Sequence, residues 1–485
     1  MLKSVSIAAA ATLAICVTVR AQVPPESVPA GTRVTQVPLS GRAGQQVTYQ
    51  GSVASAESAG PSLPLSLEEA VRRGLQYNLG TVAFQNMIRQ AQGMEQTQRA
   101  NLMPQISGGL TFTEQQVDLA ALGFSSIKSP VVAAFPTVLG PFHYFDFRAG
   151  LTQSLFDLTR RKNYRASEES VKAAQFAAQD ARDLVVLAVT GAYLQVIATA
   201  ARTQSVRAQV ATAQASYRQA ADRYTAGAAP RIDAMRSQVE LQTQQQRLTA
   251  VENDFAKLKI SLGRLIGLPS GQDFTLTDEL PFAPIAGLTL EQAIARASAN
   301  RADLKAAQSQ VHAAELALEG ARAERLPTVE VSGDYGAIGI SPQNSHGTFG
   351  VTGAVRYPIW QGGRVKGDVE QASAAVEQRR AEYQDLRGRV DAEIRSAFLD
   401  LTSAASQVAV AQSNRDLANE TLVQARDRFA AGVVDTIEVV QAQEAVASAE
   451  QDYIASLYAH NLAKANLARS MGQADQNIRQ FLARP

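Results

Sequence analysis

Two stretches of the sequence run for 68 residues each without a proline, from Thr159 to Ala226 and from Arg364 to Ala431. Alanine and other small residues fill one stripe of each stretch, and arginine, glutamine, glutamate and aspartate occupy the rest. A continuous helix of this length is roughly 100 Å long, several times the width of a globular domain. The sequence therefore predicts two very long helices that pack closely along their small residues.

The two stretches belong to a tandem duplication. Matching segments recur at an offset of 223 residues early in each copy and of 205 residues later. The pairs are LEEAV (67–71) and LEQAI (290–294), RANLMP (99–104) and RAERLP (322–327), AYL (192–194) and AFL (397–399), and RLIG (264–267) and RSMG (469–472). We therefore divide the chain into a first repeat, 64–284, and a second, 285–485, each with a helix, a β-hairpin, a long helix and a return helix.

Each repeat opens with a shorter predicted helix, Ser66–Leu102 in the first and Thr289–Arg325 in the second. A Ser or Thr at the N-cap and a glutamate in the first turn mark its start. Pro104 or Pro327 prevents its continuation.

A glycine turn follows each long helix, in the segments RYTAGAAPRID (223–233) and RFAAGVVDTIE (428–438). Gly227 and Gly432 suit the left-handed residue that ends a helix. An antiparallel helix is predicted after each turn. We expect the two turns to lie together at one end of a helical cylinder, far from the strands.

Between the helices the sequence changes to a period of two, with apolar residues alternating with polar ones over about ten residues per strand. An ordinary sheet backed by helices is one interpretation. An export signal and an aromatic cluster around Phe145 favour strands of a membrane barrel instead. The residues expected to face lipid are Ile106, Leu110, Phe145, Phe147, Val329, Val331, Val351 and Val355.

The N-terminus has the features of a secretory signal peptide, residues 1–21, with Lys3 before an apolar segment and a Val-Arg-Ala cleavage site. Lipidation at Cys16, the only cysteine, is the alternative, although Ile15 stands where a small residue is preferred. Residues 22–63 are predicted to form an extended or disordered leader. Beyond residue 21 the longest apolar run is of the LVVLAV type (184–189), so no membrane-spanning helix is expected.

Several classes of protein are disfavoured by the composition. The formal net charge is +1, from 46 basic and 45 acidic residues, so no nucleic-acid partner is indicated. His143, His312, His346 and His460 lack ligand spacing, and no nucleophile, phosphate-loop or zinc-protease motif occurs. We expect no enzymatic activity, no cofactor and no metal site.

With both repeats placed, residues 64–472 resemble the TolC-like outer-membrane efflux protein family. The resemblance rests on the duplicated L-E-[EQ]-A, the R-A-x-x-x-P before the first strand, and R-[YF]-x-A-G followed by Ile-Asp or Ile-Glu. It implies a mainly α fold with a membrane β-barrel: a homotrimer whose four strands per protomer form a 12-stranded barrel in outer-membrane lipid. The long hairpins would continue as a periplasmic α-barrel that meets a periplasmic adaptor and an inner-membrane transporter.

The resemblance also implies a constriction at the periplasmic end, just after the glycine turns. The positions that correspond to it are Glu438 and Gln441 in the second repeat and Asp233 and Arg236 in the first. Phe429 and Val434 replace the tyrosine and arginine that help to close relatives. Glu438 and Asp233 have a simpler interpretation, as first-turn acids favoured by the helix dipole.

Two functions are therefore compared. The first is a passive outer-membrane conduit of a tripartite efflux or type I secretion system, located in the outer membrane and extending into the periplasm. The second is a soluble periplasmic coiled-coil adaptor or scaffold. The sequence does not identify the cargo, because the residues expected to line the conduit are generic polar ones.

Overall fold

The structure is a computed structural model that describes residues 49, 51–54, 60–122, 136–279, 282–285 and 287–475. All of these belong to one compact unit, Gln46–Pro485. The predicted signal peptide, including Cys16, and most of the predicted leader lie outside the described residues.

The two repeats have the same order of elements. The first contains α2 (Leu67–Tyr77), α3 (Leu79–Ala100), β2 (Gln105–Asp118), β3 (Val138–Phe156), α4 (Leu158–Thr225) and α5 (Arg231–Leu265). The second contains α6 (Leu290–Asn300), α7 (Ala302–Ala323), β5 (Thr328–Gly339), β6 (Ser345–Arg356), α8 (Arg364–Ala430) and α9 (Thr436–Ser470). The two predicted long helices are confirmed as α4 and α8, of 68 and 67 residues.

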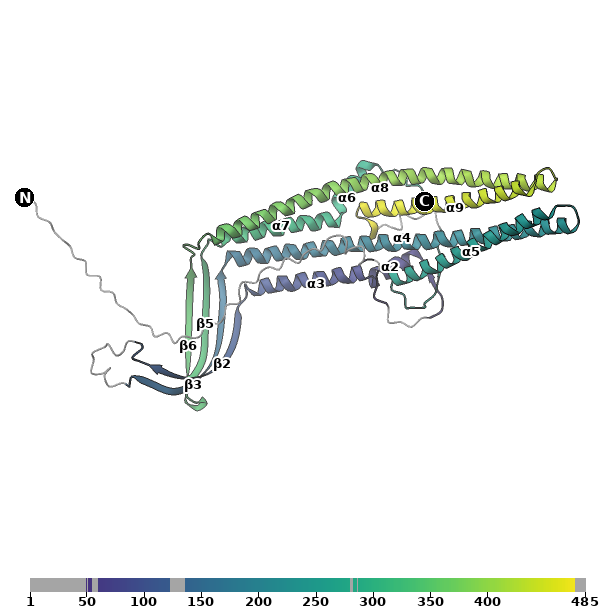
Figure 1. Cartoon of the computed structure of the whole chain (residues 1–485). Helices are drawn as coiled ribbons and strands as arrows, with labels where there is room; N and C mark the ends of the chain where they lie inside the picture. The colour runs from purple at the N-terminus through teal and green to yellow at the C-terminus, as the bar shows by residue number, and fades with distance from the viewer. Residues whose placement is uncertain are drawn as a thin grey trace, which may run out of the picture. The chain divides into compact units, whose positions relative to one another are not determined.

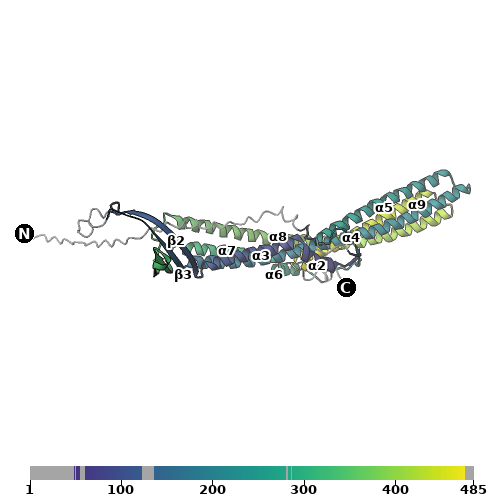
Figure 2. The same cartoon turned by 90° about the horizontal axis from the view of Figure 1, so that it is seen from below.

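The long helices pack as two antiparallel pairs, α4 with α5 and α8 with α9 (Figure 1). Helix α5 returns along α4 and α9 returns along α8, while α3 lies beside α4 and α7 beside α8 (Figure 1). Helix α4 also contacts α7 and α9, so it joins the two repeats. Within this unit the strands continue from one end of the helices, and the two hairpin turns lie at the other end (Figures 1 and 2).

The prediction of one continuous helix at the start of each repeat is wrong at one position in each. The first helix breaks at Asn78, which is fully buried; its Oδ1 accepts from the Gly80 amide and its Nδ2 donates to Tyr49 O. The second breaks at Arg301, whose buried guanidinium bonds to Asp303 and Glu393. At each break, the helix is interrupted by a residue whose buried polar side chain is hydrogen-bonded.

The four long strands form one antiparallel sheet in the order β2-β3-β5-β6. Strands β2 and β3 have 14 and 19 residues, so the expectation of about ten residues per strand is too short for the first hairpin. Strands β5 and β6 have 12 residues each. Within the described residues, β2 and β6 each pair along one side only, which leaves the sheet with two edges.

A small parallel sheet joins the beginning of the first repeat to its end, because β1 (Leu63–Leu65) pairs with β4 (Phe274–Leu276). It covers a core in which Leu65, Val189, Tyr193 and Leu262 are fully buried. Residues assigned to the leader thus take part in the fold: Leu63 begins β1, and Val53 N donates to Tyr77 O at 2.9 Å.

The expectation that no segment beyond residue 21 is apolar enough to cross a membrane as a helix is wrong. Helix α4 contains an 18-residue window with a mean hydropathy of 2.0. About half of this window, 56%, is buried inside the protein, and Val185, Val186 and Val189 are fully enclosed. The apolar side chains are therefore accounted for by the core that α4 forms with the elements around it.

Charged groups are also buried where the repeats meet. Arg469, near the end of α9, bonds to Asp180 of α4 at 2.6 Å, and burial raises the pKa of Asp180 to about 6. Lys464 is almost completely buried and donates to Ala283 O at 2.8 Å; burial lowers its pKa to about 8. These contacts fasten the end of the second repeat to the first repeat and to the linker before α6.

The hydroxyl of Tyr193 provides a test of the first-repeat core. It lies 2.9 Å from Leu65 O and 2.8 Å from Asp278 Oδ2, in a fully buried position. Tyr193→Phe should lower the free energy of unfolding by about 1–3 kcal/mol, because it removes the hydrogen bond of a buried O–H that lies between a carbonyl and a carboxylate oxygen. Thermal unfolding followed by circular dichroism measures this. Tyr217→Phe on the same helix is the control, and equal losses in both variants would contradict the assignment.

Candidate functional site: the sheet faces and the hairpin turns

The strand register gathers the apolar side chains on one face of the sheet. Ile106 lies opposite Leu151, Leu110 opposite Phe147, and Val329 opposite Val355. The eight predicted lipid-facing residues (Ile106, Leu110, Phe145, Phe147, Val329, Val331, Val351 and Val355) therefore share one face. Ile106 is 78% exposed and Val351 is 75% exposed, which is unusual for large apolar residues in a folded chain.

The opposite face of the sheet is polar and held by charge pairs. The guanidinium of Arg148 on β3 bonds to Asp146 on the same strand and to Asp334 on β5, and its Nη2 lies 3.3 Å from Thr348 Oγ1 on β6. One side chain thus connects three neighbouring strands. An apolar face against a polar one is the arrangement that a strand needs when it separates lipid from water.

At the other end of the helices, both hairpin turns have the same backbone geometry. Gly227 and Gly432 each have a φ of 72°, in the left-handed region. In both turns the glycine amide donates to the carbonyl three residues back, and the next amide donates to the carbonyl five residues back, at 2.8–3.1 Å. This is the Schellman motif, which ends α4 and α8 and starts the return helices.

The predicted aperture residues separate into two groups. Glu438 accepts from Arg428 across its own turn at 2.7 Å, and Asp233 lies 3.8 Å from Arg236. Arg236 of α5 and Gln441 of α9 both line a shallow apolar groove of about 390 Å³. Glu438 and Asp233 occupy first turns, so their interpretation as dipole-favoured acids agrees with the geometry.

Two arginines near the turns were missed by the sequence analysis. Arg428 is the partner of Glu438, and Arg223 places its guanidinium 4.7 Å from the ring centroid of Phe429. The Arg223 contact joins the last turn of α4 to the last turn of α8 by a cation–π interaction. The only signal was a basic residue at the same place in each repeat, in the last turn of each long helix.

The titratable side chains away from these surfaces do not gather into a metal-binding group in the part of the chain that the structure describes. Within the described residues, no three His, Cys, Asp or Glu side chains come together in a group that could hold a metal ion. His460 is fully buried, and its ring packs at a tilt against that of Phe282, with ring centroids 5.1 Å apart.

Comparison with known proteins identifies the fold that carries these surfaces. The sequence model of the outer membrane efflux proteins matches residues 75–268 and 293–473, well over half of the chain. The chain belongs to the outer membrane efflux protein family. Each matched range lies within one of the two repeats, and the resemblance to TolC-like proteins is thereby confirmed.

Individual relatives are similar over most of their length. The pyoverdine export outer membrane protein OpmQ of Pseudomonas aeruginosa is 23% identical, over 86% of this chain and 87% of OpmQ. The outer membrane protein OprJ of the same species is 24% identical, over 79% of each chain. The solved CmeC outer membrane channel of Campylobacter jejuni superposes with a TM-score of 0.72 at 16% identity, covering 90% of this chain and 94% of CmeC.

The protein is thus an outer-membrane efflux channel that extends into the periplasm. Its fold combines long helices of an α-barrel with strands of a β-barrel, as predicted. The alternative of a soluble periplasmic adaptor or scaffold is not supported. The family consists of channel proteins, which agrees with the expectation that the chain has no catalytic centre.

The glycine turns provide a sign-reversing test. An added Cβ at Gly432 meets no atom within 4 Å, so only the left-handed φ opposes Gly432→Ala. This substitution should destabilise the protein by roughly 1–2 kcal/mol. Gly388→Ala in the interior of α8, where the space is also open, should stabilise it by roughly 0.5–1 kcal/mol. Melting temperatures that shift in the same direction for both variants would disprove the turn geometry.

Proposed function

We propose that three copies of this chain form one conduit, in which the sheets close into a 12-stranded barrel and the hairpins form a periplasmic α-barrel. The observation that supports this most is the sheet itself, which has one exposed apolar face and two edges. In hydrocarbon every backbone amide and carbonyl needs a partner, so a four-stranded sheet has to pair its edges with other sheets. Twelve strands lie between the small side-chain-filled barrels and the wide porins, which is compatible with a solvent-filled lumen.

In this proposal the apolar face contacts outer-membrane lipid and the face with Arg148, Asp146 and Asp334 lines the lumen. The helices would then extend into the periplasm, where 68 residues of helix reach roughly 100 Å. The turns at Gly227 and Gly432 form the tip. We propose that this tip meets a periplasmic adaptor and an inner-membrane transporter, as efflux relatives such as the toluene efflux pump protein TtgF suggest by name.

The cargo is proposed to be chosen by the transporter. Relatives of similar sequence carry names with different cargoes, pyoverdine for OpmQ and toluene for TtgF, although both match more than three-quarters of this chain. A conduit that serves such different molecules is consistent with a passive role for the channel.

Neighbouring residues of β6 test the lipid-facing assignment. Val351 lies on the apolar face and Thr352 on the polar face. Val351→Arg should cost roughly 2–4 kcal/mol near the bilayer midplane, whereas Thr352→Arg should cost much less. The measurement is the amount of heat-modifiable trimer in the outer-membrane fraction. Equal yields from the two variants would exclude this barrel orientation.

The ion pair at the tip provides a test of the aperture. We propose that Glu438 of each protomer lies at the narrow end, where its charge is offset by Arg428. An exposed pair of this kind contributes only about 0.2–1 kcal/mol to stability, so either substitution should leave the protein folded. Arg428→Gln leaves the negative charge of Glu438 without its partner and should raise the cation preference of single channels in planar bilayers. Glu438→Gln removes that negative charge and should lower the cation preference.

The double variant should return close to the selectivity of the unmodified channel, because it removes one charge of each sign. If neither single substitution changes selectivity, the constriction lies elsewhere and Glu438 is only a dipole-favoured helix residue.

A further inference from the structure

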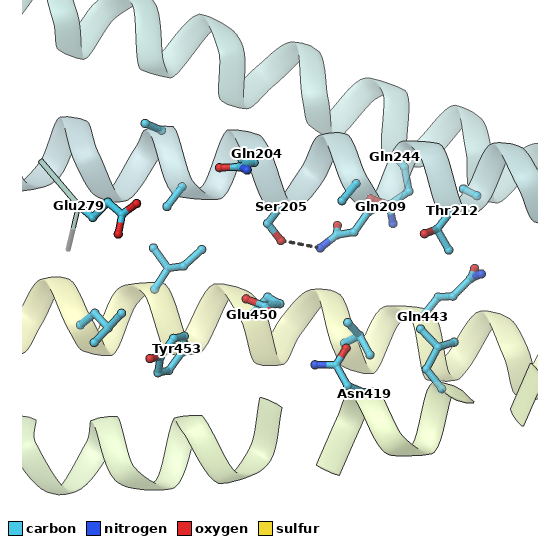
Figure 3. A pocket seen from close by; sticks show the side chains of 18 of the residues that line it. Gln204, Ser205, Gln209, Thr212, Gln244, Glu279, Asn419, Gln443, Glu450 and Tyr453 are labelled. Carbon is cyan, nitrogen blue, oxygen red and sulfur yellow. Dashed lines mark hydrogen bonds between the residues drawn. The ribbon is translucent and has the colours of Figure 1, made fainter. Parts of the chain in front are cut away.

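A cavity of about 790 Å³ lies between the two helical hairpins, away from the turns and the sheet. Its walls come from α4 and α5 of the first repeat, α8 and α9 of the second, and the end of β4 with the segment after it. Figure 3 shows Gln204, Ser205 and Gln209 on one wall, and Glu450 and Tyr453 on the other. The volume is within the range of small-molecule sites, roughly 300–1,000 Å³.

One buried polar atom at this cavity has no partner among the described residues. Gln244 of α5 is 3% exposed and lines the cavity, and its Oε1 makes no hydrogen bond. Its Nε2 donates to Glu240 Oε1 at 2.7 Å. Because a carboxylate only accepts, this bond fixes the orientation of the amide and leaves an acceptor unsatisfied. A buried acceptor of this kind favours an occupant with an N–H or O–H donor.

The charged side chains that line the cavity also favour an occupant that donates hydrogen bonds, and in particular a cation. Four carboxylates contribute, from Glu240, Asp278, Glu279 and Glu450, against one guanidinium, from Arg426. Asp278 already accepts from Tyr193 and from the Leu67 amide. Within the described residues, the ion pair of Glu450 is a long contact with Arg415, at 3.9 Å. Glu279 and Glu450 are therefore the carboxylates best placed to receive a cation.

Other parts of the lining are apolar, between neutral polar side chains such as Gln204 and Asn419. Ile197 of α4, Leu422 of α8 and Ile454 and Leu457 of α9 are buried and contribute to the walls. A bare metal ion or a hydrated polyamine would leave these side chains without a contact. An occupant with an apolar body uses both kinds of wall.

We propose that this cavity binds an amphiphilic organic cation, with an ammonium group near Glu279 and Glu450, a donor on Gln244 Oε1, and an apolar body against α4, α8 and α9. The site goes beyond the role of the chain as a conduit. Because its walls belong to both hairpins, an occupant joins the first repeat to the second. Binding should therefore raise the melting temperature of the protein.

The test uses the full-length protein in detergent and dansylcadaverine, a fluorescent primary amine with an apolar ring system. Its emission should shift to the blue in a saturable manner, with detergent micelles alone as the blank. N-acetylated dansylcadaverine keeps the apolar body but loses the charge, and should bind about tenfold more weakly. The double variant Glu279→Gln/Glu450→Gln should weaken binding of the amine by a similar factor.

The matched control is Glu252→Gln/Asp254→Asn, which removes two acidic charges from α5 outside the cavity lining and should leave the affinity unchanged. Gln244→Met removes the acceptor, and Ala208→Phe fills the cavity; both should weaken binding in a protein that still elutes at the size of the unmodified one. Absence of saturable binding would overturn the proposal. So would equal binding of the acetylated probe, or an equal loss in the control variant.

Discussion

A sheet of four strands with an exposed apolar face cannot satisfy its own edges, and much of the molecule follows from this constraint. The register that aligns β2, β3, β5 and β6 puts the eight predicted lipid-facing side chains on one side and the Arg148 charge pairs on the other. Closing such a sheet with copies of itself satisfies the backbone. Since α3, α4, α7 and α8 adjoin these strands in sequence, the placement of the helices is tied to the way in which the sheet closes.

Much of this architecture could be predicted from periodicity, because long-range repetition and alternation are properties of the sequence alone. The 68-residue proline-free stretches became α4 and α8, and the alternating segments became strands with the expected face. The breaks at Asn78 and Arg301 could not be predicted in this way. Each depends on partners more than 20 residues away, such as Tyr49 and Glu393, and local propensity contains no information about them.

The candidate site was predictable to a similar extent. Gly227 and Gly432 stand in the left-handed conformation that their sequence context indicates, because the Schellman turn is a local structure. The partner of Glu438 depends on how two helices meet, and so does the stacking of Arg223 on Phe429. The apolar window in α4 carries a related lesson: hydropathy alone does not distinguish lipid from a protein core, whereas the packing of Val185 and Val189 does.

The length of α4 and α8 has a consequence for how such proteins change size. A helix rotates by about 100° per residue, so inserting one residue would turn the remaining side chains of that helix away from their neighbours. Inserting about seven residues nearly restores the phase and adds roughly 10 Å. The two hairpin turns stay at the same height along the helix axis only if α4, α5, α8 and α9 all lengthen by the same amount. Natural length variants of this conduit should therefore differ by whole heptads, in step across all four helices.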